Sequence, residues 1–425
     1  MCESLKKIKG ECIMKMNERQ LALITEEVKR LAKLPGGFYE KKYEGIDVDK
    51  VTSQEDFEQL PFTTKADLRN AYPLGLQAVS EEEVVRIHSS SGTTGTPVII
   101  PYTAKDVDDW AIQFARCYET AGITNKDRIQ ITPGYGLWTA GIGFQLGAEK
   151  LGAMTIPLGP GNTEKQLSMM QDLKSTVITA TSSYALVLAE EIEKRGLKDK
   201  ICLKKGVIGS ERWGEKMRQK IKNTLGIQIY DIYGLTEIYG PGIGISCDYE
   251  CGMHYWDDFV YIEIVDPETG KTVPDGEQGE IVITTLVKEG APLIRYNTHD
   301  ISRIIPGKCK CGCEYPRIDT IVGRTDDMFK VKGVNMFPKQ IDDVLSEVDG
   351  VSSEYQLIID HVNGRDECFL SVEVEDALDY RAVAEQINDK LKSRVGLKMK
   401  VNPVPTGSLP RSEKKTKRVF DRRFS

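Results

Sequence analysis

Apolar and polar residues follow a helical period near the start of the chain. Between Leu21 and Leu31, apolar residues recur every three or four positions, which predicts an amphipathic helix over 17–34. The glycine pair at 36–37 ends this pattern. From about residue 84, short runs rich in β-branched residues alternate with amphipathic stretches, and such alternation favours a parallel sheet covered by helices.

The alternation places strands and helices in turn along this part of the chain. The predicted strands cover 84–87, 98–100, 128–132, 153–157, 176–180, 206–209 and 227–231. Helices are predicted after Thr103, Leu137 and Thr163, and from Tyr184 and Arg212. Asp106, three residues after Thr103, gives the first of these helices a capping-box start.

The pattern changes near residue 240 and again after about residue 323. Alternating apolar residues at 260–264 and a run at 280–286 predict a β-rich subdomain. The last part is predicted to contain a helix at 341–348, a hairpin at 357–374 that turns at Asn363-Gly364, a helix at 382–391 and a strand at 399–404. We therefore predict an α/β fold. A large N-terminal domain of helix-covered β-sheets, with the β-rich subdomain, spans 1–324, and a small α+β domain spans 325–425.

Composition narrows the class of protein. Of 425 residues, 40% are hydrophobic and 28% are charged, which excludes a disordered or collagen-like chain. No apolar run reaches the ~18 residues that a membrane helix needs, and the first residues lack the apolar segment of a secretory signal. We therefore expect a cytoplasmic protein without membrane contact. The net charge of −7 argues against nucleic-acid binding.

Five of the ten cysteines crowd into two short segments. These segments read Cys247-x₃-Cys251-x₂-His254 and Cys309-x-Cys311-x-Cys313. Without a secretory signal, such clustering indicates a reduced metal site rather than disulfide bonds. Thiolates and imidazole suit a four-coordinate structural zinc ion, so six candidate ligands predict a closed zinc site. Incidental buried thiols are the alternative.

The segment most informative about chemistry lies between the first two predicted strands. It reads His88-Ser89-Ser90-Ser91-Gly92-Thr93-Thr94-Gly95-Thr96-Pro97. Glycines let several backbone N–H groups converge on one anion, and the hydroxyls add donors, so the segment predicts a bound phosphate. It differs from the kinase-type P-loop, whose Gly-Lys-Ser/Thr it does not contain. A polar hairpin loop is the alternative.

Four further segments are weak singly and informative together. They are Tyr230–Glu237, Arg295–Asp300, Gly323–Gly333 and Leu409–Arg418. Taken alone, each has a plainer alternative: a solvent-facing glutamate for Glu237, a turn cap for Asp300 at a strand end, and a solvated chain end for the basic tail. Taken together, the four segments offer a carboxylate that could hold Mg²⁺, an acceptor for the ribose hydroxyls and cations that could bind phosphate.

In order and spacing, these five segments resemble the acyl-adenylate-forming superfamily, and most closely its phenylacetate–coenzyme A ligase branch. The stretches 60–68 and 159–163 carry the same resemblance, which spans about 55–425. It implies an acid–thiol ligase that activates a carboxylic acid with ATP and Mg²⁺ as an acyl-adenylate and releases pyrophosphate. The acyl group then passes to coenzyme A, which leaves AMP. The resemblance also implies a mobile small domain and a homodimer.

The resemblance assigns roles to individual residues. Ser91–Gly95 hold the β- and γ-phosphates, and Glu237, with Thr94, holds Mg²⁺. Asp300 binds the ribose, Arg324 contacts the nucleotide, and 209–211 and 231–234 line the adenine. The full nucleotide-binding set is Ser90, Ser91, Gly92, Thr93, Thr94, Gly95, Gly209, Ser210, Glu211, Asp231, Ile232, Tyr233, Gly234, Thr236, Asp300 and Arg324.

The implied catalytic lysine is Lys415, which bridges the acyl carboxylate and the α-phosphate. The branch pattern Ser-Glu-Gly-Lys-x-x-Arg reads Ser-Glu-Lys-Lys-Thr-Lys-Arg here, so Lys414 replaces the glycine and Lys417 is the alternative. A compact charge on a long stem suits this task. Asp326 matches the hinge about which the small domain rotates.

Three aromatic residues are candidates for the acid pocket: Tyr135, Trp138 and Phe144. They favour an aryl or arylacetic acid, with core packing as the alternative for each. For the zinc ion, the branch pattern selects Cys247, His254, Cys309 and Cys311, with Cys251 and Cys313 as alternates. After Trp256, relatives commonly read Glu-Asp-His, whereas this chain has Asp257-Asp258-Phe259.

Two other functions compete with the ligase. One is an enzyme that loads the acyl group onto a carrier protein instead of coenzyme A. The other is a zinc-stabilised nucleotide-binding module without catalysis. The presence of Glu237, Asp300 and Lys415 together argues against the second.

Overall fold

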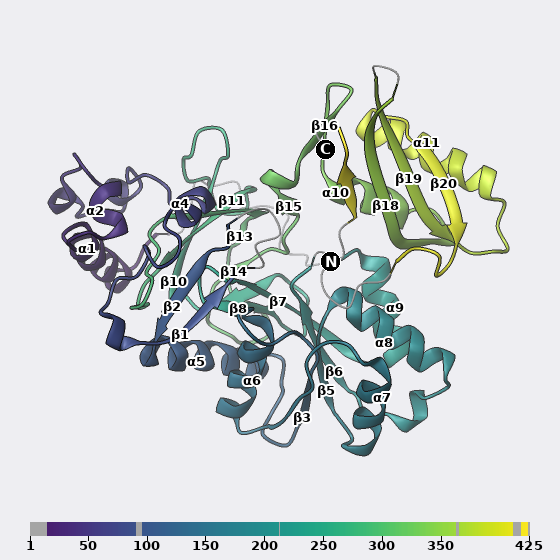
Figure 1. The fold of residues 1–425 in the computed structure, drawn as a ribbon, viewed down its shortest axis with the longest axis horizontal. Helices are drawn as coiled ribbons and strands as arrows, with labels where there is room; N and C mark the ends of the chain where they lie inside the picture. The colour runs from purple at the N-terminus through teal and green to yellow at the C-terminus, as the bar shows by residue number, and fades with distance from the viewer. Residues whose placement is uncertain (1–14, 91–95, 212, 363–364, 411–417, 424–425) are drawn as a thin grey trace.

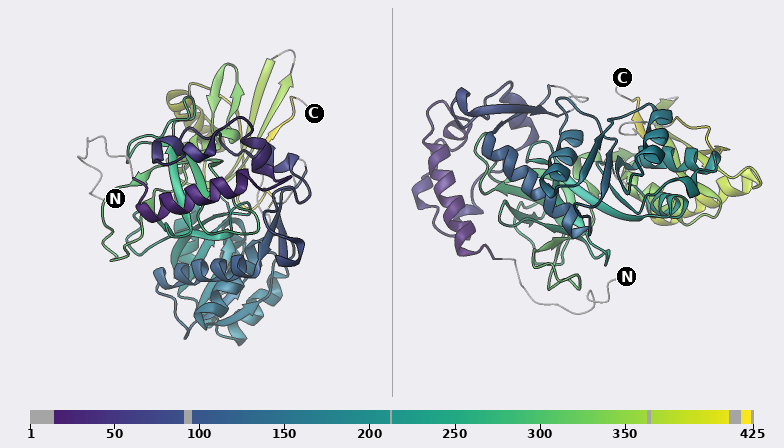
Figure 2. Two further views of the ribbon diagram at one scale, coloured as in Figure 1. Left: turned by 90° about the vertical axis from the view of Figure 1, so that its left-hand side faces the viewer. Right: turned by 90° about the horizontal axis from the view of Figure 1, so that it is seen from below.

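The chain folds into a large N-terminal part and a small C-terminal part, as a computed structural model shows (Figure 1). The structure describes residues 15–90, 96–211, 213–362, 365–410 and 418–423. The N-terminal helices lie at the opposite end of the molecule from the small part (Figure 2). Among the described residues, none of the helices is both long and apolar enough to cross a bilayer.

The first helix confirms the period seen in the sequence. The N-terminal helices are α1 (Glu18–Ala32), α2 (Phe38–Lys42), α3 (Gln54–Phe57) and α4 (Lys65–Asn70). Helix α1 starts at a capping box formed by Asn17 and Gln20, and it buries Ile24 and Val28.

A nine-stranded sheet forms the centre of the large part. Its order is β13-β14-β9-β8-β7-β6-β5-β3-β4. The strands are β3 (Arg128–Ile131), β4 (Met154–Pro157), β5 (Val177–Thr181), β6 (Lys205–Gly209), β7 (Gln228–Leu235), β8 (Gly240–Ser246), β9 (Met253–Tyr255), β13 (Ile304–Ile305) and β14 (Arg317–Ile318). Strands β3 to β7 are parallel, as predicted, and the other four are antiparallel.

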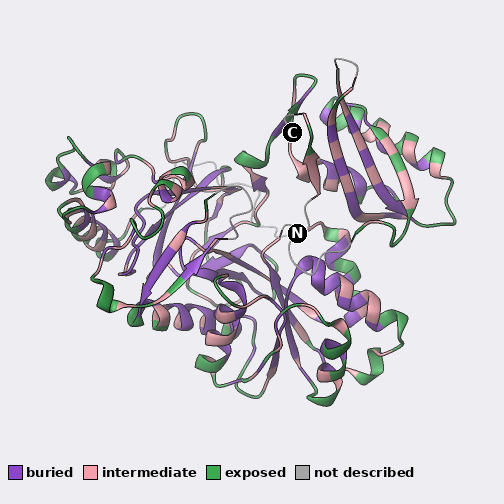
Figure 3. Ribbon diagram, viewed as in Figure 1, coloured by how far each residue is buried: buried purple, intermediate pink, exposed green. Residues whose placement is uncertain are grey.

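Helices cover both faces of this sheet. They are α5 (Ala104–Thr120), α6 (Ala140–Leu151), α7 (Thr163–Asp172), α8 (Ser182–Lys194) and α9 (Glu215–Leu225). Successive residues of a strand point to opposite faces. Accordingly, Val177 and Val207 pack in the core with α5 and α6, whereas Ile178 and Ile208 pack with α7, α8 and α9. The strands are buried and the outer helix faces exposed (Figure 3).

Smaller sheets complete the large part. Strands β1 (Val84–Ser89) and β2 (Ile99–Thr103) form an antiparallel pair around the Ser/Gly/Thr segment. The predicted β-rich subdomain is a four-stranded sheet of β10 (Val260–Val265), β11 (Gly279–Thr285), β12 (Tyr296–Ser302) and β15 (Gly323–Arg324).

The C-terminal part has its own hydrophobic core. Its elements are β16 (Phe329–Val331), β17 (Val334–Met336), α10 (Pro338–Ser346), β18 (Val351–Val362), β19 (Arg365–Val374), α11 (Tyr380–Val395), β20 (Lys400–Pro405) and β21 (Val419–Asp421). The four-stranded sheet has the order β20-β19-β18-β21. The predicted hairpin is β18–β19, and its turn at 363–364 lies outside the described residues.

Two strand predictions need correction. The strand predicted over 227–231 continues to Leu235, because β8 pairs back along it and satisfies its backbone groups. Asp300 was predicted at a strand end, but it lies inside β12, where it is paired with Arg324 of β15.

A buried ion pair fixes the chain segment that enters the site from the N-terminal helices. Arg295 Nη2 lies 2.9 Å from Glu263 Oε1, and both side chains are almost wholly buried. The same guanidinium donates to the carbonyl oxygens of Glu58 and, at 2.7 Å, Leu60. The pair therefore ties the 58–60 segment to strand β10, and α4 begins five residues further on, at Lys65.

We predict that Arg295→Met lowers the free energy of unfolding by about 3–5 kcal/mol, because it leaves Glu263 buried without its partner. Urea unfolding followed by tryptophan fluorescence measures this change in the large part, since all four tryptophans lie there. Lys50→Met is the control, because this exposed lysine of the large part pairs with Asp47 only at the surface. Equal effects of the two substitutions would contradict the prediction.

Candidate active site

The base of the Ser/Gly/Thr segment is closed by hydrogen bonds. The backbone N–H of Ser90 donates to Val98 O at 3.0 Å, and the N–H of Val98 donates to Ser90 Oγ at 3.0 Å. Ser89 N donates to Leu137 O at 2.8 Å, which ties the segment to the loop before α6. Residues Ser91, Gly92, Thr93, Thr94 and Gly95 lie outside the described residues, so their phosphate role stays a prediction.

Glu237 sits in the tight connection between β7 and β8. A Cβ atom on Gly234 would collide with the carbonyl oxygen of Gly240, so this close approach needs glycine. The Glu237 side chain is buried. Its neighbour Thr236 contacts Thr139, with 3.2 Å between the two hydroxyl oxygens. Glu237 thus lies at a turn, as predicted from the sequence, but it is buried rather than solvent-facing.

Two lysines near Glu237 were missed by the sequence analysis. Lys65 Nζ lies 3.4 Å from Glu237 Oε1, and the only signal for it was its place in the 60–68 stretch. Lys288 is buried, donates to the Ile238 carbonyl oxygen and lies 4.3 Å from the centre of the Tyr102 ring. Burial lowers the pKa of Lys288 to about 7. The glutamate is therefore flanked by one partly exposed and one buried amine.

Asp300, Tyr233 and Arg324 come together where β7, β12 and β15 meet. Tyr233 Oη donates to Asp300 Oδ2 at 2.8 Å, and Arg324 Nη1 donates to Asp300 Oδ1 at 2.9 Å. Burial raises the pKa of Asp300, while the Arg324 charge opposes that shift. Arg324 also binds Asp326 through Nε at 2.7 Å and Nη2 at 2.9 Å. The predicted ribose, nucleotide and hinge residues thus form one chain of contacts.

The predicted adenine-lining residues occupy the ends of β6 and the body of β7. Gly209 pairs with Ile232, and Ser210 has a φ of 68°. The Asp231 carboxylate accepts from Arg218 Nη1 at 2.6 Å and from Trp213 Nε1 at 2.9 Å. Glu211 accepts at 3.0 Å from Ser182 Oγ and at 2.9 Å from Ser183 N, at the start of α8. Both carboxylates are therefore bound by protein groups.

The three aromatic candidates differ in their surroundings. Tyr135 and Trp138 are half-buried in the loop before α6. The Tyr135 hydroxyl is buried without a protein partner among the described residues, as is suited to a pocket wall. Phe144 packs against Phe114, with 4.8 Å between ring centres, inside the large core. Its position favours the core alternative, and its contact with substrate stays a prediction.

Four potential metal ligands converge at one edge of the nine-stranded sheet. The ligand atoms of Cys247, His254, Cys309 and Cys311 all lie within 4.8 Å of one another. Cys247 Sγ and Cys309 Sγ are 3.7 Å apart, close to the ~3.8 Å edge of a tetrahedron with Zn–S bonds of about 2.3 Å. His254 Nδ1 is 2.8 Å from the Tyr315 carbonyl oxygen, which leaves Nε2 facing Cys311 Sγ at 3.2 Å. The donor set fits zinc.

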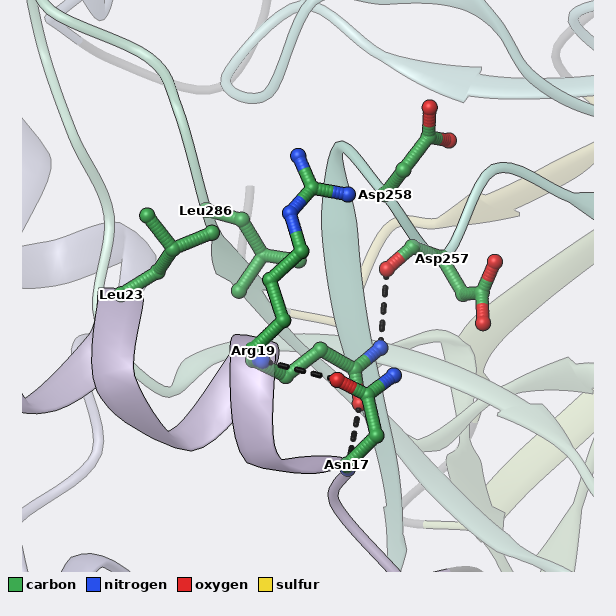
Figure 4. Close-up of a pocket in the computed structure, with 7 residues that line it drawn as sticks. Asn17, Arg19, Leu23, Asp257, Asp258 and Leu286 are labelled. Atoms are coloured by element: carbon green, nitrogen blue, oxygen red, sulfur yellow. Dashed lines mark hydrogen bonds between the residues drawn. The ribbon is translucent and has the colours of Figure 1, made fainter.

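The segment that departs from relatives packs around Arg116. Arg116 Nη1 donates to Asp258 Oδ1 at 2.8 Å, and its guanidinium lies 5.1 Å from the centre of the Phe259 ring. Beside it, Asp257 and Asp258 line a pocket of about 70 Å³ against the start of α1, where Figure 4 shows Asn17 and Arg19. This volume is far below the ~300 Å³ of a small-molecule site, so the pocket is no candidate for the acid.

A polar cluster holds the start of the small part. Glu280 receives hydrogen bonds from Asn297 Nδ2 at 2.6 Å and from Thr325 Oγ1, and its Oε1 lies 3.1 Å from His299 Nδ1. Burial opposes the charge of Glu280, but these three partners lower its pKa to about 2. The Glu280 hydrogen bond in turn raises the pKa of His299. Lys415 and Lys417 lie outside the described residues.

Comparison with known proteins decides the family. The AMP-binding enzyme model matches residues 20–286, and the AMP-binding enzyme C-terminal domain matches 333–423. The chain is 42% identical over 396 residues to phenylacetate-coenzyme A ligase of Escherichia coli (strain K12), which covers 91% of this chain and 90% of that protein. The chain belongs to the AMP-binding enzymes, in the phenylacetate–coenzyme A ligase branch.

Other ligases of the family agree with this membership. Phenylacetate-coenzyme A ligase of Thermus thermophilus is 40% identical, over 96% of this chain and 97% of its own length. Among solved structures, 2-hydroxyisobutyryl-CoA ligase in the postadenylation state gives a TM-score of 0.86 at 27% identity, over 95% of this chain and 89% of that one. The same ligase in the thioesterification state gives 0.69 at 28% identity, over the same shares. The predicted two-part α/β fold is confirmed.

We predict that the Glu280–His299 pair stabilises the protein most between about pH 4.5 and 6.5. A raised histidine pKa gives stability that is present below the unfolded value and is lost as the pH rises through the folded value. The lowered glutamate pKa gives stability that is lost as the pH falls toward 2. His299→Asn keeps a residue that tolerates the positive φ and removes the charge.

From pH 6 to pH 9, wild type should therefore lose about 0.5 kcal/mol more stability than His299→Asn, since the imidazole is partly solvent-screened. Urea unfolding at both pH values measures the difference. An identical pH dependence in the two proteins would refute the prediction.

Proposed function

We propose that this chain is an AMP-forming acid–thiol ligase that converts an arylacetic acid, phenylacetate or a close analogue, to its coenzyme A thioester. The observation that carries the proposal is the set of four relatives at 38% to 42% identity, each a phenylacetate-coenzyme A ligase matched over 90% to 96% of this chain. The half-buried Tyr135 and Trp138 support an aromatic acid.

The chemistry explains why these groups belong together. A carboxylate is a poor acyl donor because oxide would have to leave, and adenylation supplies AMP as a better leaving group. The acid's oxygen attacks the α-phosphorus of ATP, the bond to pyrophosphate breaks, and a mixed anhydride forms. In the second step the thiol sulfur of coenzyme A attacks the acyl carbon, the anhydride bond breaks, and AMP leaves. Both steps concentrate negative charge that preorganised donors and cations stabilise.

Asp300 is suited to bind the ribose. A carboxylate offers about four acceptor positions, and Tyr233 and Arg324 use two of them. The remaining capacity matches two ribose hydroxyls.

Asp231 and Glu211, which were predicted to line the adenine, are bound by protein side chains, so we propose that the backbone of β6 and β7 forms that wall.

Glu237 is the proposed Mg²⁺ ligand, together with Thr94. A buried carboxylate oxygen is the hard donor that Mg²⁺ prefers, and the ion would neutralise phosphate charge during adenylation. Lys65, 3.4 Å away, supplies a second positive group at this end of the site.

We further propose that the domains divide at 324/325 and that the small domain, 325–425, turns about Asp326 and carries Lys415. Separate hydrophobic cores support this division, because one ends at Ile321 and the other begins at Phe329. Lys415 would bridge the acyl carboxylate and the α-phosphate.

The four-residue cluster is proposed to hold structural zinc. All ligands come from this chain's own β8–β9 and 309–311 segments, and a closed tetrahedral set leaves no position for substrate. Zinc would therefore stabilise the end of the sheet and take no part in ligation. A homodimer and a cytoplasmic location stay predictions from the sequence.

We predict acid-dependent release of AMP and pyrophosphate with phenylacetate, and thioester formation when coenzyme A is added. Lys415→Ala should lower adenylation about 100-fold or more, because charge stabilisation at the α-phosphate is lost, and should leave ATP binding largely intact. Pyrophosphate exchange measures adenylation, and calorimetry measures ATP binding.

Lys398→Ala is the matched control in the same domain, since Lys398 is exposed. Unchanged turnover of Lys415→Ala would reject the lysine assignment. Adenylation without transfer to coenzyme A would instead favour a carrier protein as the acceptor, and ATP binding without adenylation would favour a non-catalytic module.

We predict about one zinc ion per chain when the protein is purified under reducing conditions. Cys311→Ser should lose most of the metal and lower the unfolding temperature by about 5 °C, because a closed site adds its binding energy to folding. Cys202→Ser, at an exposed cysteine, is the control and should change neither. Metal-free wild-type protein would count against the site.

A further inference from the structure

Lys216 of helix α9 reaches from the large domain into the small one. Its Nζ donates hydrogen bonds to three backbone carbonyl oxygens, those of Leu345 at 3.1 Å, Val348 at 2.6 Å and Val351 at 3.2 Å. An ammonium group has three N–H donors, so this contact uses all of them. Figure 1 shows α9 as the helix beneath α10 and β18.

The three carbonyls surround the end of α10. The last carbonyls of a helix have no partner within the helix, and they carry the negative end of its dipole. Leu345 belongs to the last turn of α10, Val348 lies in the turn that follows, and Val351 begins β18, so Lys216 binds the end of α10 and its turn into β18 from the other domain. Asp349 and Glu375 add negative charge near the ammonium group, while its burial at the contact lowers the pKa of Lys216. The hydrogen bonds of Lys216 therefore lie in a partly desolvated place, where they are stronger than in water.

The comparison structures show which domain arrangement this contact accompanies. One relative, 2-hydroxyisobutyryl-CoA ligase, matches this chain better in the postadenylation state than in the thioesterification state, although the aligned shares are the same. The relative and the aligned shares are the same in both comparisons. The lower TM-score with the thioesterification structure therefore reflects a difference between the two states of that relative. The overall structure here is therefore closer to the postadenylation structure than to the thioesterification structure.

We infer that Lys216 is a positioning residue that holds the small domain in the arrangement used for adenylation. This inference rests on the proposed function. A contact present in one arrangement and broken in the other shifts the balance by the free energy of that contact. Within the described residues, the hydrogen bonds of Lys216 Nζ go to backbone carbonyl oxygens of the small domain, so we infer that it acts through domain placement.

The test separates the two half-reactions. Adenylation is measured as phenylacetate-dependent ATP–pyrophosphate exchange without coenzyme A. Transfer is measured as single-turnover loss of the enzyme-bound adenylate after coenzyme A is added. For Lys216→Met we expect exchange to fall about tenfold and transfer to stay the same or rise. A tenfold fall in the exchange rate corresponds to about 1.4 kcal/mol of lost stabilisation, which is modest for three hydrogen bonds from a charged group.

Lys220→Met is the matched control. Lys220 lies one turn further along α9 and pairs at 2.8 Å with Glu190 of α8, within the large domain. The Lys220→Met variant should leave the ratio of the adenylation rate to the transfer rate unchanged. Lys216→Gln is a second variant, and intact transfer in either variant also shows that the protein has folded.

Unchanged rates in both half-reactions, or an equal fall in both, would overturn the inference, because a merely structural lysine would affect them alike. If wild type performed neither half-reaction, the proposed function itself would fail, and the inference would fall with it. The two failures are therefore distinguishable from the wild-type data alone.

Discussion

The Arg324 guanidinium is the link on which the site's organisation depends. It lies between two carboxylates, Asp300 in strand β12 and Asp326 at the start of the small domain. Two partly buried anions so close would repel each other, and the cation between them removes that cost. Because one charge serves both partners, any ligand that alters the hydrogen bonding of Asp300 also alters the attachment of Asp326. Asp300, in the proposed nucleotide site, and the start of the small part are therefore electrostatically coupled.

The elements of the fold were largely predictable from local pattern. The helix over 17–34, the parallel strands and the small α+β domain all follow from periodicity, because each buries a face that the sequence marks. The errors occur where distant strands pair. Strand β7 runs on to Leu235 because β8 folds back on it, and Asp300 lies within a strand because β15 returns from 323.

The candidate site shows the same limit. The Cys/His set, which type and spacing pick out, was predicted from the sequence, and the structure brings its four residues together. Glu237 was picked out in the same way, and its role stays a prediction. Residues that act through long-range geometry were missed. Lys65 meets Glu237, 172 positions away. Lys216 meets partners 129 or more positions away, and Lys288 meets Ile238, 50 positions away. A lysine on its own has no local signature for such contacts. Phe144 is the converse case, since its aromatic ring suggested a pocket and the structure places it in the core.

The close packing of Gly234 against Gly240 also limits which residues can replace these glycines in the proposed site. Any side chain at Gly234 would meet the opposing backbone, and one at Gly240 would meet the Trp110 ring, so the floor beneath Glu237 tolerates little variation. Tyr135 and Trp138 lie in the loop between β3 and α6, outside the strands. Diversity among enzymes built on this frame is therefore expected to accumulate in that loop, and libraries meant to redirect it toward other acids would best be confined there.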